Sequence, residues 1–304
     1  MSTKVTSNMS IKVNRKNKKE FRRTIYFLAP SVILMLLFFV GPIIITFVFS
    51  FTDMSLIGSA STHIKFVGFK NFIEMFQSPT FRTSVIKTVI FLVGSAIIGQ
   101  QVLGFSLAYL MRQKNRHVRR IVGICVLAGW VSPAMVGAFI WLSYLDYDGT
   151  LNIILTKFGM SPVSWLFAFP MVSIIIANTW KGTAFSMMIF ESALGDIPAE
   201  VEEAAIMDGA NVWQRLIYII LPMLKNTIAT NMVLISLMTI GMFGLIYAMT
   251  GGGPGMATEI LPIFMYKQAF VSYQLGYGTA ISLIILLIGI GASLFYVKLL
   301  KTEF

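Results

Sequence analysis

Long apolar runs alternate with short polar connections along most of the chain. Six runs are long enough to cross a membrane, and they cover residues 24–51, 85–111, 120–142, 170–194, 223–249 and 278–299. A bilayer core about 30 Å thick requires roughly 20 apolar residues in a helix. No water is available there to bond backbone groups, so each run is expected to be helical. The pattern predicts an all-α membrane protein with six transmembrane helices.

The composition agrees with this class. Of the 304 residues, 56% are hydrophobic and 12% are charged, whereas soluble proteins carry about 25% charged residues. The first apolar run follows a long basic leader and exceeds the ~7–15 apolar residues of a cleaved signal peptide. We therefore expect it to be a retained first helix.

The distribution of Lys and Arg predicts the orientation. The segments 1–23, 112–120, 195–225 and 298–304 hold 17 of the 24 basic residues, and such residues gather on the cytoplasmic side. We expect a basic cytoplasmic tail over 1–23, a transmembrane domain over 24–304, and both termini in the cytoplasm. The basic residues flank spans, so the net charge of +11 indicates contact with anionic lipid and not with nucleic acid.

Several runs contain residues that disturb helices. Pro30, Gly41-Pro42 and Pro133 lie within spans, and the polar segment 178–183 interrupts the fourth. A proline inside a spanning helix frees a carbonyl and bends the helix. Such bends are either ordinary irregularities or shape a cavity, and the sequence leaves both interpretations open.

The connection over residues 195–222 is acidic. Five of the 13 acidic residues fall between Asp196 and Asp208. Asp196 is expected to cap a helix that has Pro198 in its first turn and Glu200 at its positive end.

The same connection contains a predicted stop and a second start. Gly209 is expected to end the helix in a left-handed conformation. Asn211 then caps a second helix, whose apolar positions follow a 3.6-residue period.

The surface of the first of these helices suits another protein. Glu202, Glu203 and Asp208 offer charge for a basic partner, and the small side chains of Ala204 and Ala205 allow close approach. The alternative is a segment lying on lipid. That alternative is less favoured, because lipid-surface helices usually carry Lys and Arg on their polar face.

The run from Glu203 to Ala210 (EAAIMDGA), followed by Leu221-Pro222, closely resembles the EAA loop of permease subunits from binding-protein-dependent ABC importers. Leu216 stands where phenylalanine is common in that family, and Asn226 where a second proline is frequent. Further stretches resemble the carbohydrate-uptake branch, of the maltose and glycerol-phosphate type; they are residues 50–53, 66–72, 180–181, 250–254 and 276–280.

The resemblance implies a type I ABC importer permease fold in a bacterial cytoplasmic (inner) membrane. It implies four kinds of partner: a second, homologous permease subunit in a heterodimer, two cytoplasmic ATPase subunits, an extracytoplasmic solute-binding protein and a carbohydrate substrate. ATP and Mg would bind to the ATPase subunits, and no cofactor is expected in this chain. The residues implied to couple to the ATPase are Glu200, Glu203, Ala204, Ala205, Asp208, Gly209 and Ala210.

The sequence argues against an enzyme. It contains no Gly-x-x-x-x-Gly-Lys-Ser/Thr phosphate loop, no Gly-x-Ser-x-Gly and no His-Glu-x-x-His. One cysteine (Cys125, expected to be a packing residue) and two scattered histidines (His63 and His117) do not form a metal site. We therefore expect neither catalytic residues nor a metal. A secondary transporter would usually have more spans or detectable repeats.

Polar residues within the spans are candidates for a substrate pathway. Lys181 lies near mid-membrane, where a charge costs roughly 2.5–3.5 kcal/mol, so its default role is functional. Asn178 can share its helix face, and Trp180 either stacks on a sugar ring or fixes helix packing. Three others are Gln100, Asn231 and Tyr247, for which hydrogen bonding between helices is the simpler explanation. A non-sugar solute, such as a glycerol phosphate ester or a polyamine, remains an alternative.

Overall fold

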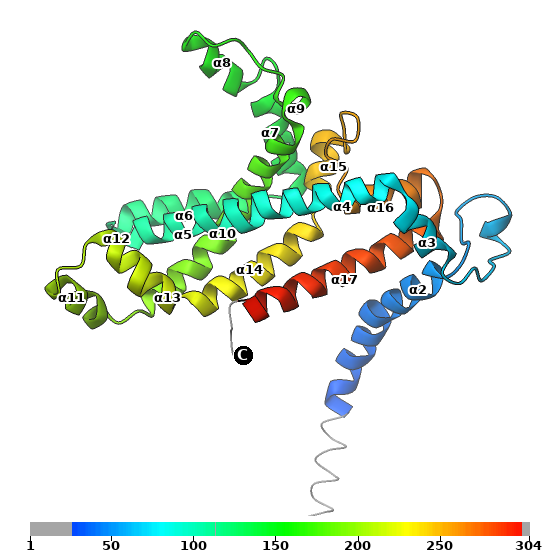
Figure 1. The fold of residues 1–304 in the computed structure, drawn as a ribbon, viewed down its shortest axis with the longest axis horizontal. Coiled ribbons are helices and arrows are strands. Elements are labelled where there is room, and N and C mark those ends of the chain that lie inside the picture. Colours follow the sequence, from blue (N-terminus) through cyan, green and yellow to red (C-terminus); the bar gives the residue numbers. More distant parts are fainter. Residues whose placement is uncertain (1–25, 113, 300–304) are drawn as a thin grey trace, which may run out of the picture.

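The computed structural model describes residues 26–112 and 114–299, which form a bundle of helices (Figure 1). The first helix covers Tyr26–Ser50 and contains η1 (Leu36–Val40) and α2 (Gly41–Ser50). It is followed by η2 (Ser59–Ser61), α3 (Lys70–Gln77), α4 (Pro79–Phe91), η3 (Leu92–Gln100), α5 (Gln101–Arg112), α6 (Arg116–Val131), α7 (Ala134–Leu145), α8 (Thr150–Lys157) and α9 (Trp165–Ala168). The second half contains α10 (Pro170–Gly195), α11 (Ala199–Met207), α12 (Val212–Arg215), η4 (Leu216–Ile220), α13 (Leu221–Met223), α14 (Lys225–Ile240), α15 (Gly244–Thr250), α16 (Leu261–Tyr266), η5 (Lys267–Val271) and α17 (Leu275–Leu299). No strand occurs in the described ranges, although one isolated β-bridge pairs Thr52 with Phe66.

The first helix projects away from the bundle, and its C-terminal part, α2, packs against α17 (Figure 1). None of its most apolar 18-residue window is buried by the rest of the chain. Pro42 follows the π-helical turn η1 inside this continuous helix, and such a local π adjustment accommodates a proline in a spanning helix. The tail predicted over residues 1–23 lies outside the described residues.

The second and sixth runs form long helices. The second run extends over Pro79–Arg112 as α4, η3 and α5, beginning earlier than the sequence predicts, and α17 covers the sixth. Ser78 caps α4 by accepting a hydrogen bond from the N–H of Phe81, which explains the earlier start.

The third run is broken at residues 132–133, so the prediction of a single helix over residues 120–142 is wrong, whereas the bend predicted at Pro133 is confirmed. The axis of Arg116–Val131 and that of the following segment, Ala134–Lys157, make an angle of 107°. Pro133 cannot donate to the carbonyl of Gly129, and the hydroxyl of Ser132 donates to that carbonyl instead at 2.7 Å. The bend turns α7 along α15 and α10 and carries α8 away from the bundle (Figure 1).

The fifth run is also broken. The helix α14 ends at Ile240, residues 241–243 are not helical, and α15 begins at Gly244. A second bend of 69° separates the segment Val212–Met223 from α14. The prediction of one helix over residues 223–249 is therefore wrong as well.

The fourth run forms the unbroken α10, so the predicted interruption at residues 178–183 does not occur. Its polar side chains are satisfied by neighbouring helices: Asn178, Thr179 and Ser186 are buried and hydrogen-bonded to α14 or to the segment around η3. A helix surrounded by protein can carry polar groups that a lipid-facing helix cannot.

Three of the described helices are long and apolar enough to cross a membrane. The number rises to five if each of the two bent helix pairs is counted as one span. The central helix α10 is not among them, because its buried polar residues lower its hydropathy.

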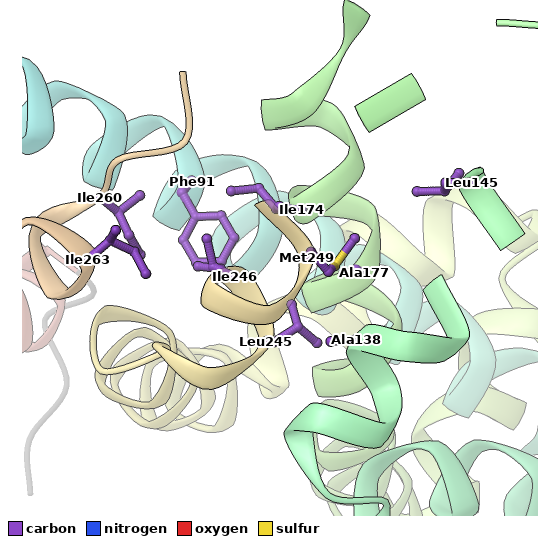
Figure 2. Close-up of a cluster of buried hydrophobic side chains, with 10 residues drawn as sticks. All are labelled: Phe91, Ala138, Leu145, Ile174, Ala177, Leu245, Ile246, Met249, Ile260 and Ile263. Atoms are coloured by element: carbon purple, nitrogen blue, oxygen red, sulfur yellow. The ribbon is translucent and has the colours of Figure 1, made fainter. Parts of the chain in front are cut away.

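A buried apolar cluster ties the broken segments to the bundle. It joins Phe91, Ile174, Ile246 and Ile263, with Ile174 facing Phe91 and α15 between them and α14 (Figure 2). This cluster holds α7, α15 and α16 against α4 and α10, at the part of the bundle remote from α11 (Figure 1).

Candidate coupling surface and substrate pathway

The acidic connection forms α11 at one end of the bundle (Figure 1). Pro198 is its N-cap residue, in an extended conformation, with Glu200 and Glu202 in the first turn. Asp196 follows the end of α10 and is not the cap, so the predicted capping role of Asp196 is wrong. Proline already has the φ that a helix start requires, and it has no N–H to satisfy.

The end of α11 agrees with the sequence prediction. Gly209 has a φ of +79°, and the N–H of Gly209 donates to the carbonyl of Ile206 at 3.0 Å. The N–H of Ala210 donates to the carbonyl of Ala205 at 2.9 Å. This pair of bonds is the Schellman arrangement, which requires a left-handed residue after the helix.

A second short helix begins at once. Asn211 accepts a hydrogen bond from the N–H of Gln214, and the side chain of Gln214 accepts one from the N–H of Asn211. Such reciprocal capping fixes where a helix starts. The turn between α11 and α12 is therefore fixed on both sides by local hydrogen bonds.

One side of α11 is fastened to the transmembrane bundle. Glu202 forms an ion pair with Arg112 at the end of α5, so the prediction that Glu202 offers its charge to a partner is wrong. Ala205 is buried against the chain. The small side chain of Ala205 thus allows close approach within this chain, and that of Ala204, which is exposed, remains available to a partner. Beside this contact Arg119 lies 3.7 Å from Glu191 on α10.

The other side of α11 is open. Glu200, Glu203 and Asp208 are exposed, and Met207 exposes 87% of its surface. Ile206 is also more than half exposed. Apolar and acidic groups therefore share one accessible surface next to a fixed turn.

The predicted pathway residues divide between two sides of α10. Asn178 and Lys181 line the same pocket, together with Gln100, Trp130 and Thr239. Their predicted shared face is thus present. The pocket has a volume of about 40 Å³, which holds two or three water molecules.

Lys181 is bound to the broken end of α6. Its ammonium donates to the carbonyl of Ser132 at 2.7 Å and to that of Trp130 at 3.5 Å. The last carbonyls of a helix carry partial negative charge and lack partners. The positive charge of Lys181 satisfies them inside the bundle, while its side chain lines the pocket.

Trp180 faces away from this pocket. Its ring packs against Trp141, with 6.1 Å between centroids, and a Cβ added to Gly129 would lie 2.9 Å from it. Trp180 also lines an apolar cavity of about 510 Å³ with Cys125. Of its two predicted roles, the geometry supports helix packing. Cys125 is exposed on α6, so its predicted packing role is wrong for the isolated chain.

Gln100 and Asn231 bridge helices. The amide of Gln100 donates to the carbonyl of Asn178 at 3.1 Å. Asn231, fully buried, donates to Gln101 and to Ser186, each at 3.0 Å. Gln100 also lines the pocket, whereas Asn231 does not, so Asn231 fits the simpler explanation of interhelical bonding.

Tyr247 lies outside the pocket, in a group of aromatic side chains. It stacks on Phe243 at 5.0 Å and contacts Tyr266 at 5.1 Å between centroids. Sequence reasoning did not identify Phe243, Tyr266 or Ser132 as parts of this region. The Ser-Pro pair at residues 132–133 was the available signal for Ser132, because the residue before a proline often ends a helix.

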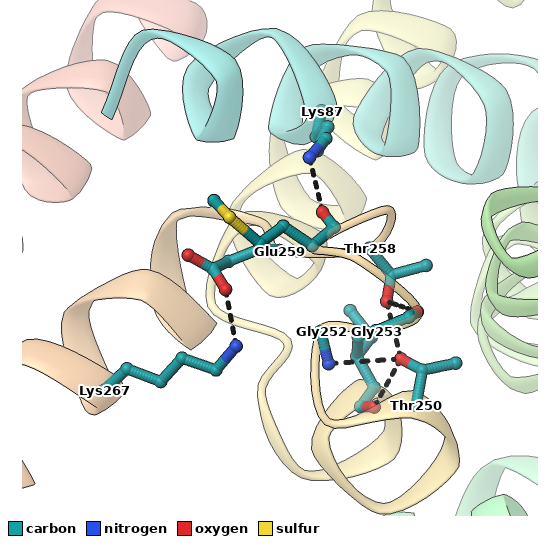
Figure 3. A network of polar contacts seen from close by, with 9 residues as sticks. Lys87, Thr250, Gly252, Gly253, Thr258, Glu259 and Lys267 are labelled. Atoms are coloured by element: carbon teal, nitrogen blue, oxygen red, sulfur yellow. Dashed lines mark hydrogen bonds and ion pairs between the residues drawn. The ribbon is translucent and has the colours of Figure 1, made fainter. Parts of the chain in front are cut away.

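The loop after α15 is held by polar contacts around its glycines. Thr250 and Thr258 share a hydrogen bond of 2.7 Å, and Thr258 also donates to the carbonyl of Gly253 (Figure 3). Glu259, which is buried, pairs with Lys267. Gly252 has a φ of +91°, and a Cβ there would approach the ammonium of Lys267. These contacts explain the Thr-Gly-Gly-Gly-Pro run as a structural turn.

The chain is thus a helical bundle with a capped, exposed helix at one end and a small polar pocket beside α10. The family described as "Binding-protein-dependent transport system inner membrane component" matches residues 100–301. The chain belongs to that family.

Curated relatives match over most of their length. The trehalose/maltose transport system permease protein MalF of Thermococcus litoralis is 33% identical over 280 residues, covering 88% of this chain and 90% of that protein. The diacetylchitobiose uptake system permease protein DasB of Streptomyces coelicolor is 26% identical, covering 91% and 86%.

A solved structure has the same fold. A chain of the bacterial alginate ABC transporter, crystallised with an alginate pentasaccharide-bound periplasmic protein, matches with a TM-score of 0.80 and 21% identity. The match covers 95% of this chain and 99% of that one.

Proposed function

We propose that this chain is one of two permease subunits of an ATP-driven importer for a carbohydrate, in a bacterial cytoplasmic (inner) membrane. The observation that carries the proposal is α11, a helix fixed by its caps and by the Glu202–Arg112 pair, with its acidic and apolar side exposed. Such a helix can transmit the movement of a bound protein to α5 and α10.

The partners follow from this division of roles. A cytoplasmic ATPase subunit, which binds ATP and Mg, receives α11 in a surface cleft. A second copy of the ATPase binds the corresponding helix of the second permease subunit, called the mate below. A homologous permease supplies the other half of the pathway, and an extracytoplasmic solute-binding protein delivers the substrate. In this arrangement the chain crosses the membrane six times with both termini in the cytoplasm, and α10 is the span that neighbouring helices enclose.

The pocket beside Lys181 supports a neutral substrate. Of the described residues that line it, Lys181 is charged and none is Asp or Glu. The ammonium of Lys181 is already bound to two carbonyls. A polyamine would require carboxylates, and a glycerol phosphate ester would favour further cations, so both are less well supported than a sugar. The relatives named above as trehalose/maltose and diacetylchitobiose permeases support the same class.

The volume of the pocket limits what one chain can bind. About 40 Å³ is far below the ~300–1,000 Å³ of ordinary ligand sites. The remaining walls would come from the mate, which agrees with a pathway formed by two subunits.

The experiment is purification of the tagged chain in detergent with identification of co-eluting subunits, followed by uptake assays in cells. The uptake panel consists of glucose, galactose and N-acetylglucosamine, each as the monosaccharide and as oligosaccharides of two to five units. Co-elution of an ATPase and a second permease, with import of at least one sugar, is the expected result. Failure of every sugar to be imported would refute the carbohydrate proposal, and absence of an ATPase would refute the coupling role.

A further inference from the structure

Four aromatic side chains lie in contact with one another near the pocket: Phe243, Tyr266 and Phe270 form a row, and Tyr247 lies beside it. The centroids of Phe243 and Tyr266 are 4.9 Å apart, and those of Tyr266 and Phe270 are 5.4 Å apart. Tyr247 lies beside the row, 5.0 Å from Phe243 and 5.1 Å from Tyr266. We call these four residues the aromatic ladder.

The ladder begins where the pocket ends. Met242 lines the pocket, and Phe243 is the next residue in the chain. Residues 241–243 are not helical, and irregular backbone at membrane depth occurs where it lines a cavity or is enclosed by protein. The ladder then continues along α16 and η5 to Phe270. Just beyond Phe270, the backbone carbonyl of Tyr273 accepts a hydrogen bond from the N–H of Leu56, in the loop after the first helix.

Phe243 packs against the buried cluster, whereas the rest of the ladder lies outside the core. On the same elements, Ile246 and Ile263 are fully buried, whereas Tyr247 is 39% exposed and Phe270 is 50% exposed. One side of α15 and η5 therefore presents aromatic rings to the surroundings. Aromatic belts in contact with lipid gather at the membrane interfaces. The ladder instead begins at the residue after the pocket-lining Met242 and extends along α16 and η5.

We propose that the aromatic ladder is a second carbohydrate subsite, which stacks sugar units of an oligosaccharide outside the pocket. Flat rings with an apolar face suit the C–H faces of pyranoses. Three rings in series are longer than one sugar unit, so the ligand is an oligosaccharide and not a monosaccharide. This inference rests on the proposed function of the chain as a sugar permease.

The first test measures whether the ladder faces water. Tyr266→Cys and Phe270→Cys are made singly after Cys125 is replaced by alanine, and the assembled importer is treated from outside with a charged, membrane-impermeant maleimide. Ile57→Cys, in an exposed loop, is the reactive control, and Ile263→Cys, in the core, is the unreactive one. Both ladder variants are expected to react. If Ile57→Cys reacts and neither ladder variant does, the rings face lipid or the mate and the proposal is overturned.

The second test measures dependence on substrate length. Tyr266→Leu and Phe270→Leu are expected to raise the KM for import of the longer oligosaccharides of the panel about three- to tenfold for each ring removed. Import of the two-unit sugar should change less. Tyr266→Phe, which keeps the ring, should leave the length dependence intact and shows that the position tolerates substitution.

The outcomes separate the two proposals. If a sugar is imported and the KM of long and short oligosaccharides changes equally, or not at all, the ladder is not a subsite and the sugar permease proposal stands. If no sugar of the panel is imported by the unaltered importer, the carbohydrate proposal fails, and the subsite fails with it.

Discussion

The ammonium of Lys181 on α10 donates to the carbonyl of Ser132 at 2.7 Å, and this contact joins the central helix to the broken end of α6. Pro133 creates the break, and the hydroxyl of Ser132 satisfies the carbonyl that the proline leaves free. The ammonium of Lys181 thus satisfies backbone carbonyls inside the bundle, while the side chain of Lys181 lines the pocket.

Replacing Lys181 with methionine tests this contact. The variant keeps the length of the side chain but leaves the carbonyls of Trp130 and Ser132 without their donor. We expect a loss of about 1–3 kcal/mol of stability, measured as a lower thermal midpoint in detergent, together with reduced uptake. Lys157→Met, at an exposed position on α8, is the matched control. An unchanged midpoint in Lys181→Met would contradict the role assigned to this contact.

The left-handed turn after α11 can be tested with two glycines of the same segment. Gly209→Val places a branched side chain at a φ of +79°, at a cost of about 1–2 kcal/mol. We expect insertion into the membrane to persist while ATP hydrolysis becomes uncoupled from uptake. Gly195→Ala, where φ is not in the left-handed region and no atom lies within 4 Å of an added Cβ, should behave as the unaltered protein. Normal uptake by Gly209→Val would count against the docking role of α11.

Substitutions of Glu202 and Glu203, which are adjacent on α11, should affect the importer in different ways. Glu203 is exposed, so Glu203→Lys is expected to weaken co-purification of the ATPase severalfold without lowering stability. Glu202 is paired with Arg112, so Glu202→Gln should loosen α11 from α5. The control is Glu74→Lys on α3, an exposed glutamate remote from α11. Equal recovery of the ATPase with Glu203→Lys and with the control would show that this side of α11 is not the docking surface.

The contact between α5 and α10 depends on a glycine. A Cβ at Gly104 would lie 2.4 Å from the Cβ of Ser186 and 3.0 Å from the backbone nitrogen of Met187. Because backbone cannot yield cheaply, Gly104→Ala should cost about 1–3 kcal/mol. Gly123→Ala on α6 should leave the stability unchanged, because a Cβ at Gly123 meets no atom within 4 Å. A comparison of thermal midpoints measures the difference, and similar midpoints would mean that the helices are not packed this closely.

Local features could be predicted from the sequence because they depend on neighbouring residues. The apolar runs became helices, Gly209 ended α11, and Asn211 capped α12, since each outcome follows from a few residues and their backbone. The capping role of Asp196 was wrong because a competing local signal, Pro198, lay two residues further on.

Tertiary features could not be predicted in this way. Pro133 indicated a bend, but the break leaves the carbonyls of Trp130 and Ser132 at the end of α6, and they receive a donor from another helix, the ammonium of Lys181. The polar residues of α10 suggested a break that did not occur, because partners on other helices satisfy them. Hydropathy cannot distinguish a helix that faces lipid from one that faces protein.

The central claim is that α11 docks a nucleotide-driven subunit, and site-directed crosslinking measures this most directly. After Cys125 is replaced by alanine, a photo-activatable crosslinker is attached to the Met207→Cys variant, whose native side chain is 87% exposed, in the assembled importer. The account predicts a crosslink to the ATPase whose yield changes when ATP is added, and no such crosslink from the Ile57→Cys variant at the other end of the bundle. Absence of an ATPase crosslink from position 207, in a preparation that hydrolyses ATP, would contradict it.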